Sequence, residues 1–140
     1  MKYASAYLRN GQVFLNPISK TTKGLLMTWD PLVISSEEDP ELGKKVLWVL
    51  SQSTVEVPHP ETFGIRSRAM AKAAGVRSYE AFADLAKCVT MDQSEEELVL
   101  TPTRNGGRGE RFLHLKTKIR CRPIEQDVAH ALRQAFEACE

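Results

Sequence analysis

The dipeptide Asn10-Gly11 constrains the fold of this chain more than any other feature of its sequence. It separates two runs of mainly aromatic and apolar residues, 3–9 and 12–15. Both central positions of a type I′ turn need a positive φ, which Asn and Gly adopt more readily than other residues. The sequence therefore predicts an antiparallel hairpin here. A polar loop is expected after it, followed by a third strand at 25–29.

A longer helix is predicted from 41 to about 52. Asp39 is a good N-cap residue, and Pro40 suits the first position of a helix. The apolar residues of this segment recur at helical spacing, which is typical of a helix that covers a core. They are Leu42, Val46, Val49 and Leu50.

Two shorter helices are expected after a proline-containing loop at 53–65. The first covers 66–74 and is closed by Gly75, which can take the left-handed conformation after a helix. The second is capped by Ser78. A last helix begins near Ile124, and its apolar face is typical of a helix packed on a sheet. That face consists of Ile124, Val128, Leu132, Ala135, Phe136 and Cys139.

Three strands are predicted before the last helix. The first covers 88–91, and the second covers 97–101 and ends at Pro102, which cannot donate to a ladder. The third, 112–122, alternates strictly between apolar and basic side chains, as a half-buried antiparallel strand requires. Its apolar side is Leu113, Leu115, Thr117, Ile119 and Cys121.

These elements predict one α+β domain over residues 1–140, in which amphipathic helices pack on a mainly antiparallel sheet. Lys and Arg number 19 against 18 Asp and Glu, so the chain lacks the basic excess of a general nucleic-acid binder. The number and spacing of its three cysteines do not indicate a disulfide framework. No stretch of the sequence has the pattern of a signal peptide or the length of an apolar membrane span. We expect reduced thiols and a cytoplasmic protein.

The sequence predicts no catalytic site, no metal site and no cofactor. The cysteines and histidines lack the spacing of zinc ligands, and no glycine-rich phosphate loop precedes a helix. His59, His114 and His130 are interpreted as surface histidines without a shared role. The less favoured alternative is a small ribonuclease in which His59 and His114 act as acid and base.

Charge clusters are the remaining candidate partner-binding sites. The acidic residues are Glu37, Glu38, Asp39 and Glu41, and separately Asp92, Glu95, Glu96 and Glu97. The basic residues are His114, Lys116, Lys118, Arg120 and Arg122. Glu97 and the basic residues could pair with each other across adjacent strands, which stabilises a sheet by a small amount. The clusters could instead form a docking surface, because complementary charge speeds encounter and fixes specificity.

Several stretches of the chain share their order and spacing with a known family. They are the acidic lead into residues 41–47, the glycine turn and helix at 74–88, the strand at 98–102, and the amphipathic helix that ends at Cys139. Through these stretches, over residues 35–139, the chain resembles the immunity proteins of bacterial contact-dependent growth inhibition systems. Ala129 departs from the pattern, because the family often has a glycine there.

The resemblance implies a non-enzymatic cytoplasmic protein that binds and neutralises the toxic C-terminal domain of a large secreted effector. Such toxins are commonly nucleases, whose basic surfaces suit carboxylates, so the acidic clusters are the first choice for docking and the basic residues the second. No membrane partner is expected. The alternative is a small nucleic-acid-binding module that uses strand 112–122, but no aromatic residues interleave with its basic side chains.

Overall fold

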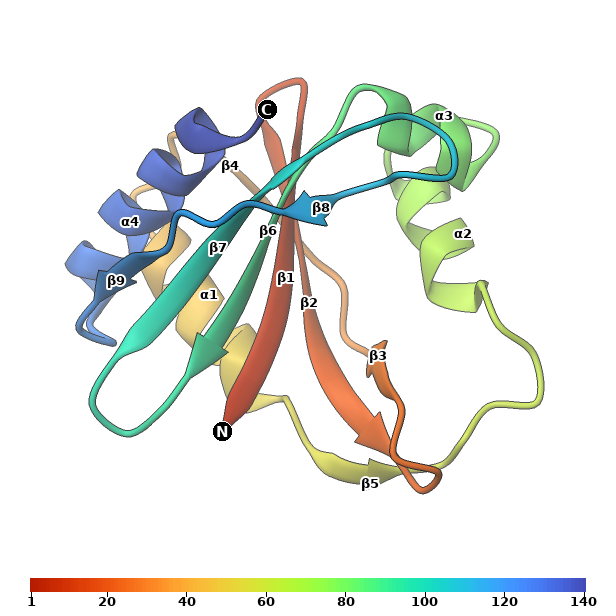
Figure 1. Cartoon of the computed structure of the whole chain (residues 1–140), viewed down its shortest axis with the longest axis horizontal. Helices are drawn as coiled ribbons and strands as arrows, with labels where there is room; N and C mark the ends of the chain where they lie inside the picture. The colour runs from red at the N-terminus through yellow and green to blue at the C-terminus, as the bar shows by residue number, and fades with distance from the viewer.

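The predicted hairpin is confirmed and supplies the two longest strands in the computed structural model, which describes residues 1–140 (Figure 1). Asn10 and Gly11 have φ values of 51° and 76°, as a type I′ turn requires. The elements in chain order are β1 (Lys2–Arg9), β2 (Gln12–Thr21), β3 (Leu26–Thr28), β4 (Val33–Ser36), α1 (Leu42–Ser51), β5 (Val55–Val57), α2 (Ile65–Ala73), α3 (Tyr79–Asp84), β6 (Lys87–Gln93), β7 (Leu98–Arg104), β8 (Leu113–His114), β9 (Ile119–Cys121) and α4 (Glu125–Ala138).

All nine strands belong to one curled sheet, which confirms the α+β class. The central order is β3-β2-β1-β6-β7-β8, and short strands add to both margins. β4 and β5 pair with β2, and β9 pairs with β7. Every pairing is antiparallel except that of β5 with β2. None of the four helices has the length and apolar character needed to cross a membrane.

Helices α1 and α4 lie side by side and cover one face of the sheet (Figure 1). Alternate residues of β1, β2, β6 and β7 point into the core beneath them, among them Ala4 and Ala6. The predicted apolar stripes of both helices complete this core, except for Ile124, which precedes α4 and is exposed. Gly43 lets the two helices touch, because a Cβ atom there would lie 1.9 Å from the main-chain oxygen of Glu125.

A smaller core lies on the opposite face, where α2 and α3 cover one end of the sheet. Its centre is the buried ring of Phe82 on α3, which meets Tyr7 and Phe14 edge-on at centroid distances of 5.7 and 5.1 Å. Ser78 caps α3 by accepting a hydrogen bond from the Ala81 N–H, and Gly75 has a φ of 77° after α2. Both helix-end predictions are therefore confirmed.

The polar loop expected after the hairpin is wrong, because β2 continues through this segment to Thr21. Its outer margin pairs first with β4 and then with β3. Pro17 lies between these two short partners, and its carbonyl accepts from the Trp29 N–H on that side. The missing proline N–H therefore faces a gap where no ladder bond is required. Strands β4 and β5 were also missed, each being only three or four residues long.

Pro102 does not end its strand, and the continuous strand at 112–122 does not form. The two errors have one cause. Pro102 lies in the middle of β7, where its carbonyl accepts from the Leu115 N–H but its ring offers no donor in return. The facing segment therefore leaves the ladder at 115–118, and only β8 and β9 remain on either side.

The predicted N-cap at Asp39 is also wrong. Helix α1 begins at Leu42, two residues later than a cap at Asp39 with Pro40 as first helical residue would place it. The Asp39 carboxylate instead accepts from the Glu41 N–H, the Ser35 hydroxyl and the Lys45 ammonium. Asp39 therefore fixes the turn that leads into the helix rather than the helix end itself.

Candidate partner-binding groove on the open face of the sheet

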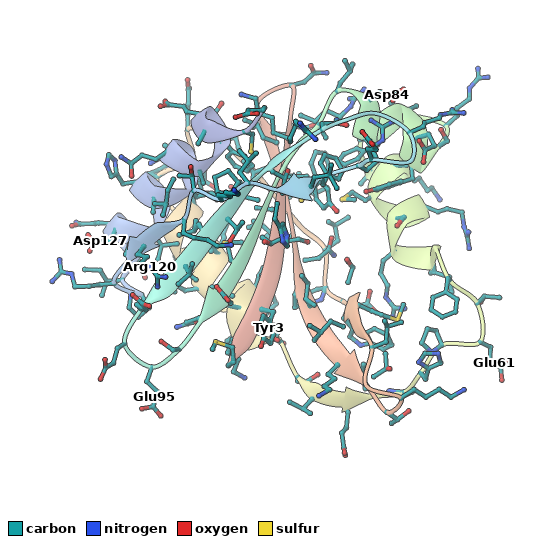
Figure 2. All side chains as sticks on the ribbon, viewed as in Figure 1. Tyr3, Glu61, Asp84, Glu95, Arg120 and Asp127 are labelled. Atoms are coloured by element: carbon teal, nitrogen blue, oxygen red, sulfur yellow. The ribbon has the colours of Figure 1, made fainter.

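The face of the sheet opposite α1 and α4 is only partly covered, and we call it the open face. Because side chains alternate along a strand, Tyr3, Ser5 and Tyr7 of β1 point to this face while Ala4 and Ala6 point to the helices. Tyr7 lies under α3 in the smaller core. The half of the face around Tyr3 is left accessible and is turned towards the viewer in Figures 1 and 2.

A groove of about 460 Å³ lies on this accessible half. Its lining comes from six segments that are distant in sequence but adjacent across the sheet. The lining residues are Tyr3, Ile18, Leu26, Thr28, Thr90, Met91, Asp92, Thr101, His114 and Lys118. A second hollow of about 350 Å³ shares Tyr3 and Leu26 with it and extends the groove past Lys20 and Val55. The groove therefore combines an apolar floor with hydroxyl groups and a few charges.

Two buried polar atoms without a hydrogen-bond partner lie on the same face. Ser5 stands between Thr90 and Asn16 across the sheet, so the three side chains share the open face. The Ser5 hydroxyl and the Asn16 side-chain oxygen both lack a partner, although the Asn16 amide donates to two carbonyls. Buried polar atoms are normally satisfied, so these two atoms are exceptions within the sheet.

Two of the five basic candidates reach the groove. His114 Nε2 lies 3.2 Å from the Thr90 hydroxyl, and Lys118 Nζ donates to the Thr101 hydroxyl at 3.0 Å. Lys118 has no carboxylate within ion-pair distance. The short edge segment from β8 to β9 thus carries positive charge over one side of the groove (Figure 1).

The other three basic candidates lie outside the groove lining. Lys116 is exposed. Arg120 donates to Glu97 at 2.7 Å, and Arg122 donates to Asp127 at 3.0 Å. Figure 2 shows Arg120 and Asp127 at the side of the molecule, beside α4. The expected cross-strand pairing of Glu97 with the basic residues is therefore confirmed for Arg120.

The first acidic cluster lies in the loop between β4 and α1 and is partly committed to the fold. The bonds from Lys45, the Glu41 N–H and Ser35 lower the pKa of the Asp39 carboxyl to about 2. Arg133 of α4 donates to the main-chain oxygens of Glu37 and Asp39. Glu38 and Glu41 are exposed. Glu41 forms a long ion pair with Lys44 at 3.8 Å, whereas the carboxylates of Glu37 and Glu38 form no ion pair.

The second acidic cluster lies around the turn between β6 and β7. Asp92 lines the groove, whereas Glu97 is paired with Arg120. Glu95 and Glu96 are exposed and carry no ion pair, and Figure 2 shows Glu95 projecting away from the sheet. This cluster therefore offers one carboxylate to the groove and two to solvent beside it.

The two acidic clusters lie at opposite ends of the strands. Glu37 N donates to Gly11 O at the hairpin turn, whereas Gln93 pairs with Lys2 at the start of β1. β1 has eight residues, so at about 3.3 Å per residue its ends are roughly 25 Å apart. The fold does not merge the eight acidic residues into one surface.

The two histidines of the ribonuclease alternative do not meet. His59 Nδ1 lies 3.0 Å from the Thr21 hydroxyl, and its ring packs on Phe63. His114 contacts Thr90, whose row across the sheet passes through Asn16 of β2. Thr21 is five residues further along β2, about 16 Å at 3.3 Å per residue. An acid and a base that act on one phosphate must both reach it, so this pairing is wrong.

The cysteines and carboxylates show no metal-binding geometry. No group of three or more His, Cys, Asp or Glu side chains lies close enough to hold a metal ion. Burial raises the pKa of the Cys88 thiol to about 12, and burial also raises the pKa values of Cys121 and Cys139. These thiols are free and only weakly nucleophilic at neutral pH.

Sequence reasoning missed most of the groove floor. It did not single out Tyr3, Ile18, Leu26, Thr90 or Thr101 as site residues. The alternation of β1 did carry a signal, since small residues face the helices while Tyr3 and Tyr7 face the other way. What it could not reveal is that α2 and α3 cover only the Tyr7 end of that face.

Comparisons with known proteins bear on this fold. The sequence matches no protein-family model and no curated protein sequence. Two solved structures share the fold along nearly the whole chain. One is described as "Protein of Unknown Function NMB0488 from Neisseria meningitidis", with a TM-score of 0.80 and 17% identity over 99% of this chain and 95% of that one.

The other is a chain of the "CdiA-CT/CdiI toxin and immunity complex from Yersinia pseudotuberculosis". It matches with a TM-score of 0.75 and 17% identity over 99% of this chain and 97% of that chain. The chain therefore has the fold of a component of a toxin–immunity complex, with the same extent from end to end.

Proposed function

We propose that this protein is an immunity protein that binds the toxic C-terminal domain of a contact-dependent growth inhibition effector and blocks its activity. The observation that carries the proposal is the full-length similarity in fold to a chain of the CdiA-CT/CdiI complex. The resemblance of residues 35–139 to the immunity family points in the same direction from the sequence. Under this proposal the protein is a non-enzymatic inhibitor that acts in the cytoplasm.

The toxin is proposed to be a nuclease, and the carboxylates beside the groove support this choice. A nuclease carries basic residues where it holds nucleic acid, and an oppositely charged inhibitor associates with it faster. Glu95 and Glu96 are exposed without an ion pair, so they are the acidic residues best placed to attract such a surface. Glu38 and Glu41 are a second, separate set at the far end of the strands.

The test of the function is neutralisation of a cognate toxin. The toxin domain is taken from the effector encoded next to this chain and is expressed in bacteria with and without it. We expect growth only when both are present, and a stable complex on size-exclusion chromatography. Absence of an adjacent effector gene, or growth arrest that this protein does not relieve, would contradict the proposal.

The contribution of the acidic residues is tested separately. A double charge reversal, Glu95→Lys with Glu96→Lys, is expected to slow association with the toxin about tenfold at low salt and to flatten its salt dependence, because long-range attraction acts on the association rate. The matched control is the reversal Glu38→Lys with Glu41→Lys at the opposite end of the strands. Equal association rates for wild type and both double variants would refute steering by carboxylates.

A further inference from the structure

We infer that the groove on the open face of the sheet receives an acidic, partly apolar segment of the partner polypeptide. The inference rests on the proposed function, since the partner is the toxin domain, and it names the surface and the chemistry of contact. Three observations carry it: the composition of the groove lining, the position of its unpaired charges, and the engagement of the strands beneath it.

The groove lining combines apolar contact area with separated hydroxyl groups. Tyr3 and Ile18 lie opposite each other on β1 and β2, and Leu26 of β3 adds a third apolar side chain to the groove floor. Leu26 is 51% exposed, and Val55 at the end of the extended groove is 70% exposed. Side chains of this kind gain free energy when a partner covers them, and apolar exposure in a concave site marks interaction surfaces.

The positive charges of the groove lie above this floor and lack carboxylate partners. Lys118 is held by the Thr101 hydroxyl, which fixes its ammonium group over the groove without neutralising it. Lys20 lines the extension beside Leu26 and forms no ion pair. Both ammonium groups can therefore bind carboxylates of an incoming segment, in the manner of charge-assisted hydrogen bonds.

The groove lining also contains a negative charge, the carboxylate of Asp92. Asp92 lies in the row of Tyr3 across β1 and β6, whereas Lys118 and His114 enter from the edge segment beyond β7. Asp92 has no ion pair with Lys118. A partner segment therefore meets the Lys118 ammonium, held at β7, and the Asp92 carboxylate on the neighbouring strand β6, and this charge pattern contributes to specificity.

The two central strands beneath the groove, β1 and β6, contribute side chains rather than free main chain. β1 is paired on both margins, with β2 and β6, and β6 is paired with β1 and β7. Their N–H and C=O groups are used in the ladder, so a segment lying over β1 and β6 is recognised there through side-chain contacts. The Ser5 hydroxyl and the Asn16 oxygen, both without a partner, lie in the same face.

Nucleic acid fits this groove less well than an acidic polypeptide does. Arg120 is already paired with Glu97, so few unpaired cations remain beside the groove for a run of phosphate groups. Tyr3 is the one aromatic residue among the groove lining, whereas single-stranded nucleic acids are held by successive stacking platforms. The apolar side chains of Ile18 and Leu26 also provide no hydrogen-bond donor or positive charge for a phosphodiester backbone.

The experiment measures binding of the purified full chain to the toxin domain, itself inactivated by substitution, by biolayer interferometry at several salt concentrations. Lys118→Glu removes and reverses the charge over the groove, and Leu26→Ser removes apolar area from its floor. We expect each to raise Kd about tenfold or more. Lys118→Arg keeps the charge and is expected to retain binding within about threefold.

Matched controls carry the same changes on surfaces outside the groove. Lys44→Glu reverses an exposed lysine on α1, and Leu85→Ser alters a leucine that is 68% exposed after α3. Both are expected to bind the toxin within about twofold of wild type. Because all four altered side chains are exposed, circular dichroism should report the same fold for every variant.

The possible outcomes distinguish failure of the groove as docking site from failure of the proposed function. Wild-type affinity for Lys118→Glu and Leu26→Ser would overturn the groove as the docking site while leaving the function intact. A wild-type chain that fails both to bind and to neutralise the toxin would contradict the function itself. Tighter binding of a single-stranded RNA oligonucleotide than of the toxin, lost in Lys118→Glu, would make the groove a nucleic-acid site and would also overturn the inference.

Discussion

Gly43→Ala is expected to destabilise the fold, although alanine is the better helix former. The reason is the approach of α1 to the first residue of α4, where an added Cβ would lie 1.9 Å from Glu125 O and 2.7 Å from its carbonyl carbon. Ordinary contact of a Cβ with such atoms begins near 3.4 Å. One helix end must therefore move by roughly 1.5 Å, and the obstacle is main chain that cannot rotate away.

The magnitude follows from two opposing effects. Overpacking by one methyl group costs about 1–3 kcal/mol, and a clash with main chain belongs at the upper end. The change from glycine to alanine inside a helix recovers about 1 kcal/mol. The net loss is about 2 kcal/mol, which lowers the Tm of a chain of this size by roughly 7 °C.

Chemical and thermal denaturation followed by circular dichroism measure this loss. Lys44→Ala, the next residue on the same helix, is the matched control, because its side chain is 66% exposed and forms only a long ion pair with Glu41. We expect the control to stay within about 0.5 kcal/mol of wild type. A Gly43→Ala variant as stable as wild type, or more stable, would refute the close approach of the two helices.

Three further predictions address the acid response, a loop anchor and a thiol. The hydrogen bonds from Lys45, the Glu41 N–H and Ser35 lower the pKa of the Asp39 carboxyl from 3.8 to about 2 in the folded chain. The ionised carboxylate therefore stabilises the fold above pH 4, and this stabilisation is lost as the pH falls towards 2. Asp39→Asn should therefore lose less stability than wild type between pH 5 and pH 3 in urea titrations. Asn105→Ala removes bonds to the carbonyls of Ala83 and Ala86, so we expect a loss of about 1–3 kcal/mol and faster tryptic cleavage at 104–111. Cys88, whose thiol pKa is raised to about 12 by burial, should react with a chromogenic disulfide reagent only when urea unfolds the chain. Rapid labelling of Cys88 in the native state would contradict its burial.

The elements that sequence reasoning predicted correctly are those fixed by neighbours in sequence. Asn10-Gly11 determines its own turn, Ser78 caps the helix that follows it, and Gly75 closes the helix before it. The apolar stripes of α1 and α4 likewise depend only on helical spacing. Each of these signals acts within a few residues, so no knowledge of tertiary structure is needed to interpret it.

The errors share a different physical origin, which is the partner across the sheet. Whether Pro17 or Pro102 interrupts a strand depends on whether its missing N–H faces a ladder or a gap. Both face gaps between two short outer strands, and that arrangement comes from segments elsewhere in the chain. The alternation at 112–122 could not reveal that Pro102 lies opposite the middle of this segment, and Leu113 and Thr117 of its predicted apolar side are exposed.

In the candidate site, too, sequence reasoning was correct for local patterns and wrong where distant segments decide. Periodicity placed His114 and Lys118 together on the solvent side of one strand, and both do reach the groove. The acidic residues were grouped by nearness in sequence, yet Asp39 is used to fix a turn and Glu97 to bind Arg120. Which charges remain free for a partner is decided by internal pairing, and a single sequence does not contain that information.

The unequal cores on the two faces of the sheet imply that the molecule does not open as one unit. The core under α1 and α4 contains 17 buried residues, whereas the one under α2 and α3 contains five. Local opening needs the least free energy where the least apolar surface is lost. Amide hydrogens of α2 and α3 will therefore exchange with solvent through partial unfolding, while those of β1 and β6 will exchange only when the whole chain unfolds.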